Sequence, residues 1–328
     1  MMKKLFVVLV ILVLLLPLAF YLTGGTELVM DQPDFLLADK SLNSLLVRGW
    51  GWLHGVIGDT GSPQVTLGKE DTLFFTPALN SAIGAERLGG RRLNDLAGRI
   101  AGVSTRLAQA GTRFVLLIVP DKAQMYPHML PWYIRPVLPA DTDSARLIAR
   151  LHELGVAAPD LRTVLASQPA QTYLKTDTHW NAYGAYLAFL HLITAADYAD
   201  PYGFTLEDFH QETPAPGDLT PLFLPGVVDP QTDRLPPLER AYRAQTPMRG
   251  VDDLHIKTTS NSVGLSVYAA RDSFGRALFP YLANMASNMV FTRDYARFEE
   301  QAKGFDLAVL VIAERSLGDL GAYLAPVD

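Results

Sequence analysis

Two patterns of apolar and polar positions alternate along the chain. Between Arg91 and Ala110, apolar residues recur every three or four positions, which predicts an amphipathic helix that Gly111 ends. The segment 113–120 follows, and its centre is the apolar run FVLLIV. A short run without polar positions is typical of a strand buried on both faces in a parallel sheet. Helix, glycine and buried strand together indicate an α/β unit.

The same unit recurs towards the C-terminus. The spacing predicts further helices over 143–154, 181–196 and 274–288, and further strands over 156–161, 262–269 and 305–312. Two short strands are also expected within 65–75, around the turn Gly-Lys-Glu-Asp. Because helices and buried strands alternate, we expect an α/β sandwich with a mainly parallel sheet.

One long segment, residues 201–257, lacks this periodicity. It carries many of the chain's 22 prolines. A stretch of this length without regular structure is expected to be a lid or an excursion that faces the substrate. We refer to residues 201–257 below as the excursion.

The N-terminal residues favour a membrane anchor. Lys3 and Lys4 precede an uncharged run, 5–22, that only Pro17 interrupts. About 20 apolar residues span a bilayer, and flanking lysines stay on the cytoplasmic side. Since no clear Ala-x-Ala site follows, an uncleaved signal anchor over 1–23 is favoured over a cleaved signal peptide. In either case we expect the remaining chain in the periplasm, held at the inner membrane or free.

The segment 24–63 is expected to hold a polar tether and then an amphipathic helix within 41–57. Trp50 and Trp52 of this helix would lie either at the membrane interface or against the main domain. The predicted domain plan is therefore an anchor (1–23), this connecting segment, and a catalytic domain over 64–328.

Composition excludes several function classes. The chain has 328 residues, 49% hydrophobic and 19% charged, so it is globular. A net charge of −6 argues against nonspecific binding of nucleic acid, which needs a basic face. No cysteine is present, which excludes disulfides and thiolate chemistry. The histidines show no metal-ligand spacing and no glycine-rich phosphate loop occurs, so we expect neither a metal nor a cofactor.

The first candidate for chemistry is Asp177-Thr178-His179-Trp180, directly before the predicted helix 181–196. Asp-x-His in such a loop suits a carboxylate that orients an imidazole. Taken alone, the same residues would also make a polar helix cap.

A candidate nucleophile follows another buried strand. Ligands in open α/β sheets bind beyond the carboxyl ends of the strands, and Asp272-Ser273 lies there, before a helix. The Ser273 N–H would point at a developing oxyanion. An ordinary N-cap is the alternative, and the Gly-x-Ser-x-Gly signature of α/β hydrolases is absent. Combined, Asp177, His179 and Ser273 supply a Ser-His-Asp relay.

Five weaker candidates surround these residues. Lys122, at the carboxyl end of the FVLLIV strand, and Arg271 are possible oxyanion donors, Lys122 being equally well placed as a solvated loop lysine. Trp180 and Tyr183 suit stacking on a sugar ring, with a core role as the favoured alternative. Arg276 suits an acidic polymer, with an ordinary surface arginine as the alternative.

The order Asp-Thr-His-Trp-Asn, helix, and later Arg-Asp-Ser-Phe resembles the alginate O-acetyltransferase group of SGNH-hydrolase-like proteins, the periplasmic J and X types. Further matches lie at 68–75, 119–122 and 217–219. Two positions depart from the pattern, since members usually have glycine at the place of Arg271 and often tryptophan at the place of Thr72.

This resemblance implies a permuted SGNH fold, a three-layer sandwich in which acid and base precede the serine. It also implies transfer of an acetyl group, through a Ser273 acyl-enzyme, to an exported polysaccharide such as alginate. A membrane-bound O-acyltransferase would be the donor. Two alternatives stay open: an acetylesterase with the same relay, and a non-catalytic polysaccharide-binding scaffold.

Overall fold

The computed structural model describes residues 62–139, 141–222, 231–245, 247–262 and 264–324, which belong to one compact unit. The predicted anchor (1–23) and nearly all of the segment 24–63 lie outside these residues. Among the helices of the described part, none is both long and apolar enough to cross a bilayer. The anchor therefore stays a prediction.

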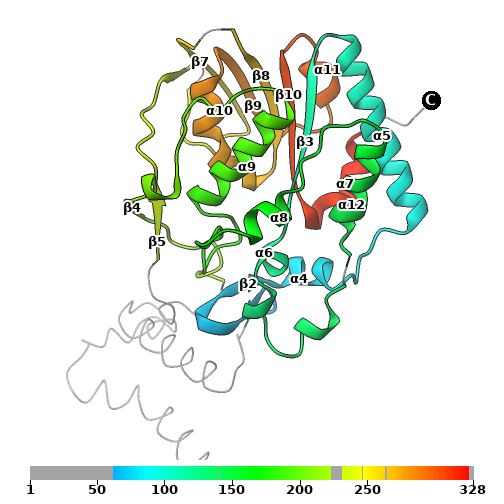
Figure 1. Cartoon of the computed structure of the whole chain (residues 1–328), viewed down its shortest axis with the longest axis vertical. Helices are drawn as coiled ribbons and strands as arrows, with labels where there is room; N and C mark the ends of the chain where they lie inside the picture. The colour runs from blue at the N-terminus through cyan, green and yellow to red at the C-terminus, as the bar shows by residue number, and fades with distance from the viewer. Residues whose placement is uncertain (1–61, 140, 223–230, 246, 263, 325–328) are drawn as a thin grey trace, which may run out of the picture. The chain divides into compact units, whose positions relative to one another are not determined.

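A six-stranded sheet in the order β3-β10-β8-β9-β7-β6 forms the centre of the fold (Figure 1). Its first four strands are parallel to one another: β3 (Arg113–Val119), β10 (Leu307–Ala313), β8 (Ser266–Arg271) and β9 (Asn288–Thr292). Next to them, β7 (His255–Ser260) pairs antiparallel with β9, and the edge strand β6 (Tyr242–Ala244) pairs antiparallel with β7. The sheet is mixed, with the predicted parallel arrangement in its larger part.

Helices cover both faces of the sheet, which confirms the predicted α/β sandwich. One face carries α5 (Gly90–Gln109), α7 (Asp143–Glu153), α11 (Phe298–Ala302) and α12 (Leu317–Tyr323). The other carries α8 (Leu161–Ala166), α9 (Ala182–Ala195) and α10 (Phe279–Met285). Successive strand residues face opposite sides, so Leu116 and Leu117 of β3 belong to different cores. This explains why β3 and β10 are apolar at nearly every position.

Short elements surround the sheet. As predicted, β1 (Val65–Leu67) and β2 (Leu73–Phe75) pair antiparallel, and the turn η1 (Lys69–Asp71) joins them. The helix α4 (Thr76–Ala82) follows β2. After β3 come α6 (Lys122–Met125), η2 (Pro127–Met129) and η3 (Arg135–Val137), and after β10 comes η6 (Glu314–Ser316).

The excursion is not structureless, contrary to the prediction. It contains η4 (Leu206–Asp208), the antiparallel pair β4 (Gln211–Pro214) and β5 (Thr232–Leu235), all of β6, and the start of β7. The prediction was wrong because the β4 and β5 positions are mostly exposed and polar. Such strands bury no alternating apolar face, so they leave no period of two in the sequence.

Two other predicted elements are wrong in detail. The segment 156–161 makes only an isolated parallel bridge from Ala157 to Val115, because Asp160 caps α8 through the Arg162 N–H. The helix predicted over 274–288 is the 3-10 helix η5 (Ser273–Leu278) followed by α10, and its last residues enter β9.

Candidate active site

The parallel strands β3, β10 and β8 end at the same edge of the sheet. Three polar side chains follow directly: Lys122 after β3, Arg315 after β10 and Ser273 after β8. In open α/β sheets this edge is where ligands bind. The topology thus collects candidate groups that are far apart in sequence.

Asp272 fixes the turn that presents Ser273. Its Oδ1 accepts the Phe274 N–H at 2.9 Å, as the N-cap of η5, and its Oδ2 accepts the Ala313 N–H at 2.6 Å. The second bond ties the turn to the end of β10. Burial raises the pKa of Asp272, although these backbone N–H groups oppose the shift. The two interpretations of Asp272-Ser273 are therefore compatible: Asp272 is the helix cap, and Ser273 stays the candidate nucleophile.

The structure brings Asp177, His179 and Ser273 into one chain of hydrogen bonds. His179 Nε2 lies 2.7 Å from Ser273 Oγ, and His179 Nδ1 lies 2.7 Å from Asp177 Oδ1. The same Asp177 oxygen accepts the His179 backbone N–H at 2.8 Å. This is the geometry that a Ser-His-Asp relay requires. The catalytic roles themselves stay predictions.

Asp177 is held as a carboxylate. Burial alone would raise its pKa, but the hydrogen bonds and charge of His179 outweigh this effect and keep the pKa below its ordinary value. An ionised Asp177 accepts the Nδ1–H of a neutral imidazole, which leaves the Nε2 lone pair facing Ser273.

The Ser273 N–H stays a candidate oxyanion donor. It lies at the start of η5, where backbone N–H groups lack helical partners. Among the hydrogen bonds between described residues, it has no acceptor. A donor in this state is available to a developing negative charge.

Lys122 is neither an oxyanion donor nor a solvated lysine, in contrast to both expectations. Its side chain is buried, and Nζ donates to the carbonyls of Leu174, Lys175 and Asp177 at 3.0, 2.9 and 2.6 Å. Burial lowers the pKa of Lys122 to about 7, while the carboxylates of Asp177 and Asp218 oppose the shift. Its three donors are used to hold the loop that carries the acid and the base.

Arg271 also differs from its expected role. It is fully buried, and its guanidinium donates to the backbone carbonyls of Val251 and Asp272 and lies over the Phe291 ring. A Cβ at Gly275 would come within 2.5 Å of the Arg271 Cβ, so the turn closes directly over this side chain. These contacts hold Arg271 beneath the turn, where its buried Nε has no hydrogen-bond partner among the described residues.

The remaining candidates separate into core and surface. Trp180 is buried and donates through Nε1 to the Phe274 carbonyl at 3.2 Å, the core role that was favoured. Tyr183 is half-buried and packs against the core, in line with the favoured core role, and its hydroxyl donates to Gln168 Oε1 at 2.8 Å. It also borders a cleft of about 410 Å³, so it stays a candidate for substrate contact. Arg276 is exposed and pairs with Asp252 at 3.1 Å.

Comparison with known proteins decides the family. Residues 65–274 match the family model described as "SGNH hydrolase-like domain, acetyltransferase AlgX". The chain belongs to this family. The matched range contains all three residues of the hydrogen-bonded chain, Asp177, His179 and Ser273.

Curated relatives of this family carry the name "Probable alginate O-acetylase AlgJ". The Pseudomonas putida protein is 33% identical over 207 residues, 61% of this chain and 51% of the relative. The Azotobacter vinelandii protein is 30% identical over 215 residues, 60% and 50% of the two chains. The match thus spans about half the length of these relatives.

Solved structures share the fold at lower identity. The O-acetyltransferase domain of Pseudomonas putida AlgJ has a TM-score of 0.50 at 22% identity, over 78% of this chain and 92% of that one. Bacillus cereus PatB1, solved with a sulfonyl adduct, has a TM-score of 0.57 at 16% identity, over 80% and 100%. These similarities confirm the SGNH-like fold.

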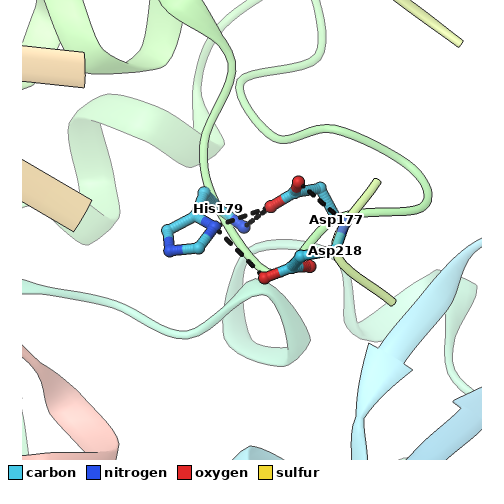
Figure 2. A group of neighbouring side chains, drawn as sticks. All are labelled: Asp177, His179 and Asp218. Atoms are coloured by element: carbon cyan, nitrogen blue, oxygen red, sulfur yellow. Dashed lines mark hydrogen bonds and ion pairs between the residues drawn. The ribbon is translucent and has the colours of Figure 1, made fainter. Parts of the chain in front are cut away.

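Asp218 is the site residue that the sequence reasoning missed. Its Oδ2 lies 3.4 Å from His179 Nδ1, beside Asp177 (Figure 2). The signal that could have found it is Gly217-Asp218-Leu219, a match to the AlgX family that was given no role. The three groups lie within 4.8 Å, a spacing compatible with a cation, but the oxygens of both carboxylates accept N–H or O–H bonds. The expectation of no metal stays a prediction.

Proposed function

We propose that this chain is an O-acetyltransferase that carries an acetyl group on Ser273 and passes it to a hydroxyl of an exported polysaccharide. The observation that carries the proposal is the chain of two 2.7 Å hydrogen bonds from Asp177 through His179 to Ser273, in a member of the AlgX family.

The first half-reaction acylates the enzyme. Ser273 Oγ attacks the acetyl carbonyl of the donor, and His179 Nε2 takes the hydroxyl proton. The new C–O bond gives a tetrahedral oxyanion, which the Ser273 N–H faces. Collapse breaks the bond to the donor oxygen, and His179 returns the proton to that leaving oxygen.

The second half-reaction reverses the roles. A sugar hydroxyl attacks the acetyl-Ser273 carbonyl while His179 takes its proton, and collapse returns this proton to Ser273 Oγ. Asp177 keeps the imidazole in one tautomer through both steps. If water attacks in place of the sugar, the same relay is an acetylesterase.

The setting of this reaction is also part of the proposal. The name of the curated relatives makes alginate the first acceptor to test. The lysine-flanked apolar run 5–22 supports attachment to the inner membrane with the relay in the periplasm. A membrane-bound O-acyltransferase would then supply the acetyl group next to the relay.

Transfer and hydrolysis are separated by adding an acceptor. The full chain in detergent is given a chromogenic acetyl ester as donor, with alginate oligosaccharides or an uncharged glucan oligosaccharide of equal length. We expect mass spectrometry to find acetyl on the alginate fragments, with donor turnover that rises with their concentration. If the rate of donor turnover does not change with the concentration of either acceptor, and acetate is the product, the result would favour the esterase. No turnover at all would favour the non-catalytic scaffold.

A further inference from the structure

Asp218 contacts the Asp-x-His loop through both of its carboxylate oxygens and through its backbone N–H. Its Oδ1 accepts the Thr178 N–H at 2.7 Å, and the Thr178 hydroxyl lies 2.9 and 2.7 Å from its two oxygens. Its Oδ2 lies 3.4 Å from His179 Nδ1. In return, the Asp218 N–H donates to Asp177 Oδ2 at 3.0 Å. Figure 2 shows the two carboxylates directed at the same side of the imidazole.

The neighbours of Asp218 fix its backbone. The Leu219 N–H donates to the Thr176 carbonyl at 3.2 Å, and the Leu219 side chain is buried with Val65 and Leu73. A Cβ at Gly217 would lie 1.9 Å from the same Thr176 carbonyl, so only glycine permits this approach. The Gly-Asp-Leu segment of the excursion is thus docked on the loop by its backbone, which places the Asp218 carboxylate beside Thr178 and His179.

The imidazole faces an uneven set of charges. Charged groups on the elements around it include Asp177 on its own loop, Asp218 and Asp233 on the excursion, Asp272 after β8, Lys122 on α6, and Glu314 and Arg315 on η6. Lys122 is directed at backbone carbonyls and Arg315 pairs with Asp121 at 2.5 Å. The two carboxylates at Nδ1 are the closest charges, so a positive imidazole is stabilised by both.

We propose that Asp218 is a positioning residue of the relay, a second carboxylate that locks the Asp177–His179 loop and stabilises the imidazolium formed when His179 takes the Ser273 proton. Its effect on rate rests on the proposed function, whereas its effect on the imidazole does not. The proton moves from Ser273 Oγ to His179 Nε2 and on to the leaving oxygen, and Asp218 neither gains nor loses one.

Asp218→Asn tests the charge with little change of shape. The amide keeps an oxygen for the Thr178 N–H but removes the negative charge from Nδ1. We expect kcat/KM on a chromogenic acetyl ester to fall by about tenfold or more, and the acid limb of the pH–rate profile to move at least about 0.5 unit lower. Asp218→Glu, which keeps the charge, should restore the position of that limb.

Asp233→Asn is the matched control. Asp233 also comes from the excursion and also accepts a backbone N–H of the loop region, that of Ala182 at 3.0 Å. No hydrogen bond or ion pair joins it to His179 in the described part of the chain. If Asp218 acted only by docking the excursion, both variants would lower the rate and leave the pH profile in place, which would overturn the proposal.

A direct titration makes the test independent of turnover. The His179 ring is followed by NMR against pH in Ser273→Ala protein, with and without Asp218→Asn, and is assigned by comparison with His179→Gln. We expect the midpoint to move to lower pH when Asp218 is changed, in protein whose circular dichroism is unaltered. An unmoved midpoint contradicts the role of Asp218, even if the chain turns out to have no acetyltransferase activity.

Discussion

Ser273 and His179 reach their shared hydrogen bond from two regions that are built differently. Ser273 follows β8, whose strand is hydrogen-bonded on both sides and nearly fully buried, and Asp272 ties its turn to β10. His179 lies in a loop between α8 and α9, outside the named strands. Lys122 holds this loop by donating to its carbonyls, and the excursion holds it by accepting its backbone N–H groups.

The difference separates the two contributions to the site. The buried strand β8, together with the two hydrogen bonds of Asp272, sets the position of the candidate nucleophile, so changes there affect folding as well as the site. A polar network sets the position of the base, and such a network is sensitive to the loss of a single partner. We therefore expect damage in the loop region to lower activity more than stability, and damage at the strand end to lower both.

Among these variants, we expect Lys122→Met to lower activity most. Three carbonyls of the loop lose their donor, so the acid and base lose their fixed position, and displacement by about 1 Å can cost about 100-fold in rate. We expect kcat/KM to fall by about 100-fold. Stability should fall by only about 1 to 3 kcal/mol, because the variant also removes a buried charge. Ester kinetics and urea unfolding measure the two quantities.

Lys175→Met is the control for this change. Lys175 lies in the same loop, but its Nζ donates a single bond to the Glu70 carbonyl at 3.2 Å near the surface. Its loss should change stability by less than about 0.5 kcal/mol and activity by less than about threefold. If the two lysine variants lost equal activity and equal stability, the three bonds of Lys122 would have no special effect on the loop, and its anchoring role would be contradicted.

Asp272→Ala should lower activity and stability together. The variant leaves the Phe274 and Ala313 N–H groups without their acceptor. We expect a stability loss of about 2 to 3 kcal/mol and a loss of about 10-fold or more in kcat/KM. Thr142→Ala is the control, because it removes a comparable N-cap from α7, which contains none of the relay residues. It should lower the free energy of unfolding by about 1 kcal/mol and leave the kinetics unchanged. Normal activity in Asp272→Ala would show that the turn does not need this tie.

Arg276→Ala should have the smallest effect. Its guanidinium is exposed and, within the described part of the chain, pairs with surface Asp252, an arrangement worth about 0 to 1 kcal/mol. We expect hydrolysis of a small ester to change by less than about twofold. A loss that appears with alginate oligosaccharides but not with a neutral acceptor would instead place Arg276 in contact with an acidic polymer.

The sequence predicted the strand-end half of the site well. Runs such as FVLLIV and FDLAVLVI permit few structures other than buried parallel strands, and the parallel topology then forces the residues after them to one edge. The position of Ser273 follows from this rule. The Asp-x-His spacing likewise places an acid within reach of a histidine without knowledge of the fold.

The loop half could be predicted only in part. Lys122 looks like a loop lysine because its burial depends on three carbonyls 52 to 55 residues later in the chain. Arg271 looks available because nothing local shows that Gly275 closes the turn over it. Asp218 lies 41 residues beyond Asp177, in a polar segment without periodicity. Contacts made by backbone carbonyls and isolated polar residues leave no pattern in a single sequence.

The most direct test of the central claim is the identity of the acylated residue. The protein is incubated with a chromogenic acetyl ester, quenched in acid, digested and analysed by mass spectrometry, in parallel with Ser273→Ala. In the protein that retains Ser273, we predict acetyl on the peptide that contains this residue. In Ser273→Ala, we predict neither acetyl on that peptide nor turnover of the ester. Full acetyl release by Ser273→Ala, or acetyl on another residue with unchanged kinetics, would contradict the relay.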